Sequence, residues 1–529
     1  MHRPDIEPPS FPAPELYRYN KHVPVEKWPK YGYCHHQRKM IECTYRFNEF
    51  IVTMTISPFH AAGIEARPGP RYRAIADALR DAIKMGTLLP GTKLPPLRDL
   101  AYELGVTVGT VSRAYALAAS RGEVSGEVGR GTFVLGAPTG KAASSGVGSA
   151  AFLTIPDTTQ AAMKAAYAPP AGQTEVIRAV MTELLAEPQP QDAPSLFNSY
   201  LTPGGDARQR EAAAAWLAHG DYKPQADELI ICSGAQQGIL AAILSATEPG
   251  DTILTEALTY QAMVVQATLL GRRVSPVDID GEGIEPGALS RAASETRPAA
   301  LFIVPTLQNP TSAIMSEERR REIAEIARRH EFAIIEDDVY GALAPERPVP
   351  IAHILPEQTY YVTSLAKSVG CGLRVGFLKP PAAMLERTRA INHAFGQTVP
   401  PLMARLATRL MENGDGTMLT GKLREEMCAR HEIAAAALKG RKLAAHPASL
   451  YVWMALPDTW HAHVFVEAAR ARGVAIAAGE DFMVGRTDRA SRHVRLAIGQ
   501  PQSREELAAG LGIVSELLDA GPISSSLVA

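Results

Sequence analysis

Short apolar runs that recur after about residue 150 constrain the fold more than any other feature of the sequence. Each run is followed by a segment with helical periodicity before the next run begins. The runs cover residues 229–232, 252–254, 301–304, 333–335, 360–363 and 375–378. Because they are continuously apolar and alternate with helices, they predict a parallel sheet that helices cover on both faces. Ligands of such sheets bind at the carboxyl ends of the strands, so the residues that follow the runs are the first candidates for a site.

The loop after the 360–363 run contains the strongest candidate. Ser364 and Lys367 lie in this glycine-containing loop, and Arg374 begins the next apolar run. The neighbours of Lys367 are mostly apolar, and poor hydration lowers the pKa of a lysine and favours the neutral amine that can attack a carbonyl. A solvated loop lysine is the ordinary alternative for this residue taken alone.

Two further strand ends carry groups that suit a phosphate and an aromatic ring. Gly234, Ala235 and Gln236 follow the 229–232 run and open a helix, whose backbone N–H groups and dipole favour a phosphate. A glycine-containing turn of this kind is weak evidence alone, and many such turns bind nothing. Tyr260 follows the next run, where its ring could stack on a ligand or simply pack in the core.

The last two strand ends carry an amide and a carboxylate. Asn309 follows the 301–304 run, and turn chemistry is the only local reason for its presence there. Asp337 and Tyr340 follow the 333–335 run. A buried carboxylate at that place is costly unless a cation lies close to it.

In order and character these residues resemble the site of fold-type-I aminotransferases, which use pyridoxal 5′-phosphate (PLP). The resemblance implies that Lys367 forms a Schiff base with PLP and shuttles protons, while Asp337 keeps the ring nitrogen protonated. It implies that Asn309 and Tyr340 hydrogen-bond the phenolic oxygen and that Tyr260 stacks on the ring. Lys367, Asp337 and Tyr340 would be the catalytic residues. The same resemblance assigns the phosphate to Gly234, Ala235, Gln236, Ser364 and Arg374.

Two distant residues extend the resemblance. Arg495, in the string HVRLAIG, matches the arginine that binds an amino acid α-carboxylate in these enzymes, with Asn309 beside the substrate; its alternative is a salt bridge on a strand. Tyr200, in YLTPGG, matches the tyrosine that reaches the phosphate of the neighbouring subunit. The resemblance therefore implies a homodimer. Residues 449–454 are expected to form a strand of a small domain.

Residues 67–135 are organised differently. A helical pattern starts at Arg71, two short helices are expected at 97–104 and 109–120 around a glycine-containing turn, and two short β runs follow within 121–134. This pattern predicts a helix-turn-helix with a wing. Residues 67–134 contain ten Lys and Arg but six Asp and Glu, although the whole chain has a net charge of −2. The basic charge is therefore local.

This segment resembles the winged-helix DNA reader of the GntR family. The resemblance is carried by LPPLRDLA (94–101), LGVT (104–107), TVSRAY (110–115) and GRGTFV (129–134). It implies that DNA is contacted by Arg98, Thr107, Thr110, Ser112, Arg113, Arg130 and Gly131, with Arg98 on a phosphate and the last two at the minor groove. Val108 and Gly109 depart from the family, because they stand where it usually offers Arg or Asn to base edges. Sequence preference would then rest on methyl contacts, Arg113 and DNA shape. The alternative is a head that has lost DNA binding.

A GntR-like head ahead of an aminotransferase-like body resembles the MocR-type regulators over about residues 70–515. The expected fold is α/β, with a winged helix-turn-helix followed by a large domain with a mostly parallel sheet and a small α+β domain. The expected parts are an extension (1–66), the head (67–135), a flexible linker (136–150), the body (151–520; large domain about 200–395, small domain 151–199 and 396–520) and a tail (521–529).

The resemblance implies a PLP-dependent transcription regulator that binds a double-stranded DNA operator and senses an amine or amino acid effector. A working aminotransferase that acts on an amino acid and a 2-oxo acid is the first alternative, because the residues needed for transamination are all present. A PLP-free interaction protein is the second alternative, and it requires Lys367 to be incidental.

The remaining composition limits other functions. The five cysteines are scattered, which fits a reducing cytoplasm, and the N-terminus lacks the apolar core of a signal peptide. No membrane span is expected. The extension contains Cys34, His35, His36 and Cys43, whose spacing matches no common zinc pattern, so no metal is expected.

Overall fold

The computed structural model describes residues 70–84, 88, 92–120, 124–127, 131–134, 160–188, 195–485 and 490–521. The expected extension and linker, Arg130 and the four possible metal ligands Cys34, His35, His36 and Cys43 lie outside these residues. The chain divides into two units, residues 1–141 and 142–529. Each unit has its own core, and each is described by itself.

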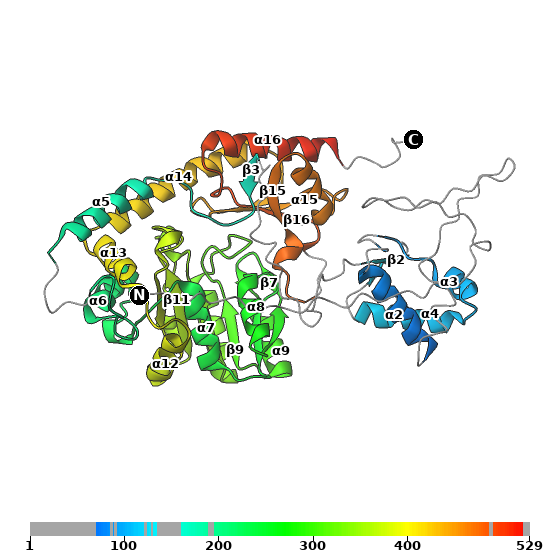
Figure 1. Ribbon diagram of the computed structural model, residues 1–529, viewed down its shortest axis with the longest axis horizontal. Helices are drawn as coiled ribbons and strands as arrows, with labels where there is room; N and C mark the ends of the chain where they lie inside the picture. Colours follow the sequence, from blue (N-terminus) through cyan, green and yellow to red (C-terminus); the bar gives the residue numbers. More distant parts are fainter. Residues whose placement is uncertain are drawn as a thin grey trace, which may run out of the picture. The chain divides into compact units, whose positions relative to one another are not determined.

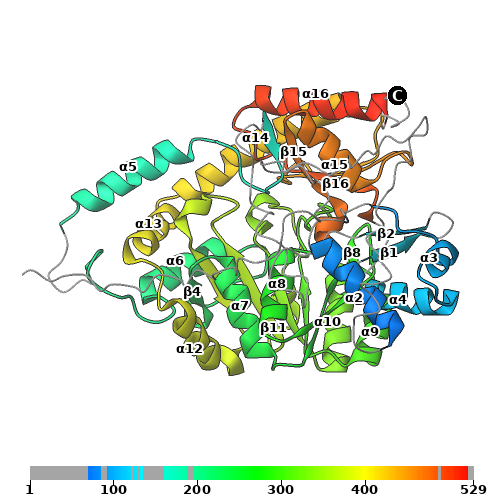
Figure 2. The ribbon, with the colours of Figure 1, turned by 45° about the vertical axis from the view of Figure 1, so that its right-hand side comes forward.

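A seven-stranded sheet forms the centre of the second unit (Figures 1 and 2), with the strand order β4-β12-β11-β10-β9-β5-β6. Its strands are β4 (Ile230–Cys232), β5 (Thr252–Glu256), β6 (Arg273–Val277), β9 (Ala300–Ile303), β10 (Ala333–Asp337), β11 (Thr359–Ser364) and β12 (Gly376–Lys379). The sheet is mixed, because β12 runs antiparallel to both of its neighbours, whereas the other pairings are parallel. The expectation of a mostly parallel sheet is confirmed, with β12 as the exception.

Both faces of this sheet are buried, which explains the continuous apolar runs of the sequence. Ile253, Phe302 and Ile335 pack on one face in a cluster with residues of α7 (Ala235–Ala246) and α8 (Gln261–Leu269). The alternate residues of the same strands pack on the other face with α9 (Pro286–Thr296), α10 (Glu317–His330) and α11 (Ile351–Ile354). Three further helices, α5 (Gln173–Ala186), α6 (Ala207–Leu217) and α13 (Pro401–Glu412), share a third cluster with strand residues of the sheet.

A smaller sheet has the order β13-β14-β16-β15-β3 and lies above the large sheet in Figures 1 and 2. Its strands are β13 (Leu443–Ala444), β14 (Val452–Ala455), β16 (His493–Leu496), β15 (Val474–Ala478) and β3 (Ala161–Met163). The helices α14 (Asp415–Ala437), α15 (Ala462–Ala471) and α16 (Arg504–Ala520) complete this part of the chain, whereas α12 (Leu385–Gly396) packs against α7 and β4 of the large sheet (Figure 1). The fold-type-I expectation of a large and a small domain is confirmed.

The predicted strand at 449–454 begins later, at Val452. The side chain of Ser449 accepts a hydrogen bond from the backbone N–H of Tyr451, and the Ser449 N–H bonds the carbonyl of His446. These bonds form a turn, so the residues before Val452 are not available to the sheet ladder.

The first unit contains the winged helix-turn-helix. Its helices are α2 (Arg71–Lys84), α3 (Leu97–Glu103) and α4 (Val108–Ser120), and β1 (Val124–Glu127) pairs antiparallel with β2 (Gly131–Val134) as a wing. The predicted head is therefore confirmed as a fold. Within the described ranges of both units, every helix is too short or too polar to cross a membrane.

Candidate cofactor site

The structure brings most of the predicted site residues to the carboxyl edge of the large sheet. Gly234, Ala235 and Gln236 follow β4, Tyr260 follows β5, Asn309 follows β9, Asp337 ends β10, and Ser364 ends β11. The carboxyl ends of parallel strands meet at one edge, which is why segments far apart in the sequence converge here.

Lys367 and Asp337 interact electrostatically at this edge. Lys367 is partly buried, and its Nζ donates a 2.7 Å hydrogen bond to the carbonyl of Ala166. Burial lowers the pKa of Lys367 to about 8, helped by the positive charge of Arg495, while Asp337 acts in the opposite sense. Burial raises the pKa of Asp337, which is 3% exposed, to about 7, and the Lys367 amine opposes that rise. The pair therefore combines a nucleophilic amine with a buried acid.

A cradle for an anion lies where β4 meets α7. Gly234 has a φ of 86°, and a Cβ at this position would lie 2.8 Å from Nη2 of Arg374. Arg374 Nη2 donates to the carbonyl of Ser233 at 3.3 Å, beside the first turn of α7. Glycine is thus required for the guanidinium to approach a helix N-terminus, and both groups favour a phosphate. Ser364 is buried and lies close to Lys367 in the sequence. Its Oγ accepts a hydrogen bond from the N–H of Ala366 at 3.4 Å.

Gln236 lies in this turn but pairs with an aromatic residue. Its Nε2 donates a 2.6 Å hydrogen bond to Oη of Tyr260. Tyr260 precedes α8 and is partly buried, and burial raises the pKa of its phenol. The side chain of Gln236 therefore orients Tyr260, and its backbone remains available to an anion.

Arg495 is held by neutral partners. It lies on β16 and is 2% exposed; Nη1 donates to Oδ1 of Asn309 at 2.7 Å and Nη2 to the carbonyl of Lys164 at 2.6 Å. Its Nε is buried and has no hydrogen-bond partner among the residues that the structure describes. The guanidinium thus bonds an amide and a carbonyl where a structural salt bridge would supply a carboxylate, and an anionic ligand would offset its desolvation.

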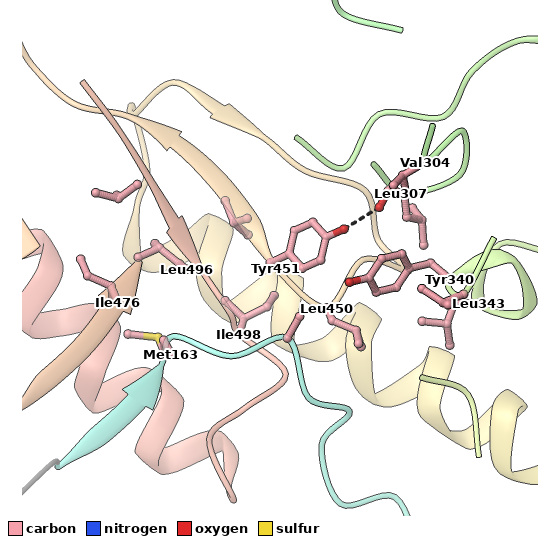
Figure 3. Packing of buried hydrophobic residues seen from close by; sticks show 14 of the residues in the cluster. Met163, Val304, Leu307, Tyr340, Leu343, Leu450, Tyr451, Ile476, Leu496 and Ile498 are labelled. Atoms are coloured by element: carbon pink, nitrogen blue, oxygen red, sulfur yellow. Dashed lines mark hydrogen bonds between the residues drawn. The ribbon is translucent and has the colours of Figure 1, made fainter. Parts of the chain in front are cut away.

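Tyr340 belongs to a pair of buried phenols (Figure 3). The rings of Tyr340 and Tyr451 meet edge to face with centroids 5.7 Å apart, and Tyr451 Oη donates to the carbonyl of Leu307 at 2.5 Å. Burial raises the pKa of both phenols above the usual range, so both stay protonated near neutrality. Tyr340 therefore lies at the site as a neutral hydroxyl.

Tyr200 lies apart from these residues in the single chain. Its side chain is 77% exposed, and it belongs to none of the buried clusters of the described residues. One chain does not bring it into the site.

The predicted DNA residues of the first unit lie mostly on its surface. Arg98, Thr107, Ser112 and Arg113 are exposed, and Thr110 is partly exposed. The hydroxyls of Thr107 and Thr110 are 2.9 Å apart, and Thr107 Oγ1 also accepts from the N–H of Thr110, which caps the start of α4. Gly131 begins β2, and Arg130 lies outside the described residues.

Comparisons with known proteins match both units. The GntR family of bacterial regulatory proteins matches residues 71–134, and the aminotransferase class I and II family matches residues 165–511. The HTH-type transcriptional regulator YdeF of Bacillus subtilis is 30% identical over 457 residues, which cover 86% of this chain and 96% of that protein. This chain is a MocR-type regulator of the GntR family. A GntR head implies DNA binding, and aminotransferase class I and II domains typically bind PLP.

More distant matches of this MocR-type chain are also a transcriptional regulator and an aminotransferase. The vitamin B6 salvage pathway transcriptional repressor PtsJ of Salmonella typhimurium is 26% identical over 426 residues, covering 79% of this chain and 92% of that protein. The solved structure of Pyrococcus horikoshii kynurenine aminotransferase matches with a TM-score of 0.62 at 22% identity, covering 70% of this chain and 91% of that chain. At this identity the structural match shows the fold alone.

The MocR-type site contains a buried acid that the sequence did not single out. Glu256 ends β5, is fully buried, and accepts from the N–H of Val304 at 3.3 Å and, weakly, from Oγ1 of Thr259. Burial raises its pKa to about 8. No local signal marked Glu256, because a single acid at the end of an apolar run also suits a solvated turn.

We expect Glu256→Gln to stabilise the protein increasingly as the pH rises. In the unfolded chain Glu256 ionises near its ordinary pKa of 4.5, whereas in the folded chain it stays protonated up to about pH 8. Between these values the wild type loses stability relative to the neutral glutamine variant. In urea denaturation, the free energy of unfolding of Glu256→Gln relative to that of the wild type should increase by about 2–4 kcal/mol from pH 4.5 to pH 8.5. A constant difference across this range would contradict the buried, protonated state of Glu256.

Proposed function

We propose that this MocR-type regulator binds PLP at Lys367 and uses it to sense an amino acid. The observation that carries the proposal is that the Lys367 amine interacts electrostatically with the buried Asp337 and with Arg374 of the Gly234–Arg374 cradle. When bound, PLP supplies an aldehyde that amines attack and a ring that withdraws electrons.

Different residues of the chain would bind different parts of the cofactor. Arg374 and the first turn of α7 suit the phosphate, and the Asp337 carboxylate suits a protonated ring nitrogen. Tyr260 would stack on the ring, oriented by its hydrogen bond from Gln236. The lowered pKa of Lys367 leaves part of its amine neutral near pH 7, so the amine can attack an aldehyde and later carry a proton.

Arg495 supports an amino acid rather than a simple amine as the effector. A guanidinium has five N–H groups, and Arg495 uses two of them to donate to Asn309 and to the carbonyl of Lys164. The remaining N–H groups could bind a carboxylate in the plane of the guanidinium. The effector that fits is a compound with an amine and a carboxylate on neighbouring atoms.

The exposure of Tyr200 supports a homodimer. The side chain of Tyr200 is 77% exposed and that of Phe197, close by in sequence, is 71% exposed, which supports the proposal that another chain covers this surface. In the proposed dimer Tyr200 reaches the phosphate of the partner. The effector would then act by changing how the two chains, and hence two heads, meet a DNA operator.

A specific DNA prediction concerns Arg98. This exposed residue on α3 is proposed to contact a phosphate, so Arg98→Ala should weaken binding to the upstream DNA of the gene about 10-fold. The slope of log affinity against log salt should fall by about 1. Arg470→Ala on α15, which removes the same charge from the other unit, is the matched control and should leave both quantities unchanged. An Arg98→Ala protein with wild-type affinity would contradict the placement of α3 on the phosphate backbone.

The experiment that tests the whole function is footprinting on this upstream DNA with and without PLP and amino acids. The proposal requires a protected segment whose extent or affinity changes when PLP and an amino acid are both present. Protection that is indifferent to both ligands would overturn the sensing role.

Catalytic transamination is the second candidate function, and the electrostatic interaction of Lys367 with both Asp337 and Arg495 favours it. Mixing the PLP-loaded protein with an amino acid and a 2-oxo acid separates the two. A single spectral change supports sensing, whereas repeated turnover with formation of a new amino acid supports the enzyme.

A further inference from the structure

The ring of Phe482 covers one face of the Arg495 guanidinium. The Cζ of Arg495 lies 4.5 Å from the Phe482 ring centroid and 5.3 Å from that of Tyr451. Phe482 is 1% exposed and meets Trp453 edge to face with centroids 6.1 Å apart. Trp453 in turn stacks on His493 at 5.1 Å. The guanidinium therefore lies against rings that are themselves fixed by packing.

Phe482 also belongs to a segment that crosses to the large sheet. The carbonyl of Phe482 accepts from the N–H of Thr259 at 2.9 Å, and the N–H of Val484 donates to the carbonyl of Ala257 at 3.0 Å. Nε2 of Gln261 donates to the carbonyl of Met483 at 3.2 Å. Residues 482–484 are thus bonded to the loop that carries Tyr260, so one short segment connects the Arg495 side chain to the aromatic residue of the cofactor site.

This arrangement lowers the entropy that the Arg495 side chain would lose on binding a carboxylate. A long arginine side chain loses rotamer entropy when it binds a carboxylate, unless it is already held in one orientation. The two hydrogen bonds to Asn309 and Lys164 fix the edge of the guanidinium, but they leave rotation of the plane to the surrounding packing. An aromatic face at 4.5 Å fixes that plane and attracts the cation without using any N–H group.

We propose that Phe482 is a positioning residue for the effector carboxylate, acting through Arg495. The inference rests on the proposed function, because it takes Arg495 as the carboxylate ligand. It adds that recognition of the carboxylate, and only of the carboxylate, depends on the ring of Phe482. Binding of PLP and of amines that lack a carboxylate is independent of it.

The test uses the PLP-loaded full chain and compares amino acids with their decarboxylated amines. L-alanine is paired with ethylamine and L-phenylalanine with 2-phenylethylamine, and the spectral change of the cofactor gives the half-saturating concentration. Phe482→Leu keeps an apolar side chain but removes the aromatic face. It should raise the half-saturating concentration of the amino acids about 5- to 30-fold, the factor expected for a desolvated cation–π contact. The values for the two amines and for PLP should stay unchanged.

Two controls separate positioning from a general effect of packing. Phe465→Leu removes another fully buried ring that meets a tryptophan, Trp460, edge to face, and no cation of the described residues lies over this ring. The variant should not change the ratio of the half-saturating concentrations of amino acid and amine. In an Arg495→Ala background, Phe482→Leu should have no further effect on amino acids.

The results of this experiment distinguish failure of the Phe482 proposal from failure of the proposed function. Equal weakening for amino acids and amines, or an undiminished effect in the Arg495→Ala background, would overturn the role of Phe482 alone. A wild-type protein that responds to the amines but not to either amino acid would overturn both that role and the assignment of Arg495. Failure of the wild type to take up PLP would overturn the proposed function itself.

Discussion

Replacing Lys367 by alanine should give a protein that retains no covalently attached PLP. The proposed bond forms from the Lys367 amine, whose pKa of about 8 leaves a neutral fraction at neutral pH and which interacts electrostatically with Asp337. Borohydride reduction, denaturation and mass measurement should find about one equivalent of cofactor on the wild type and none on Lys367→Ala.

Lys223→Ala is the matched control for this experiment. Lys223 is an exposed lysine of the same unit, and its replacement should leave the attached cofactor at the wild-type level. Retention of reduced cofactor by the Lys367→Ala chain would place the attachment elsewhere.

Arg320→Leu should lower the free energy of unfolding by about 3–5 kcal/mol. Arg320 is fully buried on α10; Nη1 lies 3.6 Å from Oε1 of the buried Glu336, and Nη2 donates to the carbonyl of Pro305 and to Oγ1 of Thr306. Its loss leaves a buried acid without its cation and removes a hydrogen bond to Oγ1 of Thr306, whereas the Pro305 carbonyl still accepts from the N–H of Met315. Urea denaturation followed by circular dichroism measures the difference.

Two further variants control for this interpretation. Arg321→Leu removes the neighbouring arginine, whose ion pair with Glu317 is exposed, and should change stability by less than about 1 kcal/mol. Adding Glu336→Gln to Arg320→Leu should recover part of the loss, because glutamine carries no buried charge and its single side-chain oxygen can still accept from the N–H of Ile351 or of Ala352, although not from both. Equal effects of Arg320→Leu and Arg321→Leu would show that the buried pair has no special importance.

The central strands could be predicted because both of their faces are buried. The edge strand β6 could not, since it contains Arg273 and Pro276 and only Val277 is buried, so no apolar run marks it. The direction of β12 was missed for a different reason. Apolar content identifies a strand but carries no information on whether the chain enters it from the same end as its neighbours.

The residues of the site that sequence could suggest are those whose chemistry is unusual for their position. Lys367, Asp337 and Asn309 are polar groups at the ends of apolar strands, so each needs an explanation. Tyr451 and Phe482 carry no such signal, because an aromatic residue in an apolar segment ordinarily packs in the core. Their importance comes from contacts across long separations, such as Tyr451 with Leu307 and Phe482 with Arg495.

The placement of Gln236 shows the same limit. Its position in a turn before a helix predicted a phosphate contact, yet its side chain donates to Tyr260, which lies 24 residues later. The turn could be identified from local sequence, but the side-chain partner depends on how β4 and β5 are arranged in the sheet.

The most direct test of the account is to locate the cofactor on the chain. The wild-type protein is incubated with PLP, reduced with borohydride and digested, and the modified peptide is sequenced by mass spectrometry. We expect a single modified residue, Lys367, and loss of this modification in an Asp337→Ala variant assayed at limiting PLP. Modification spread over several surface lysines, with Lys367 unmodified, would contradict it.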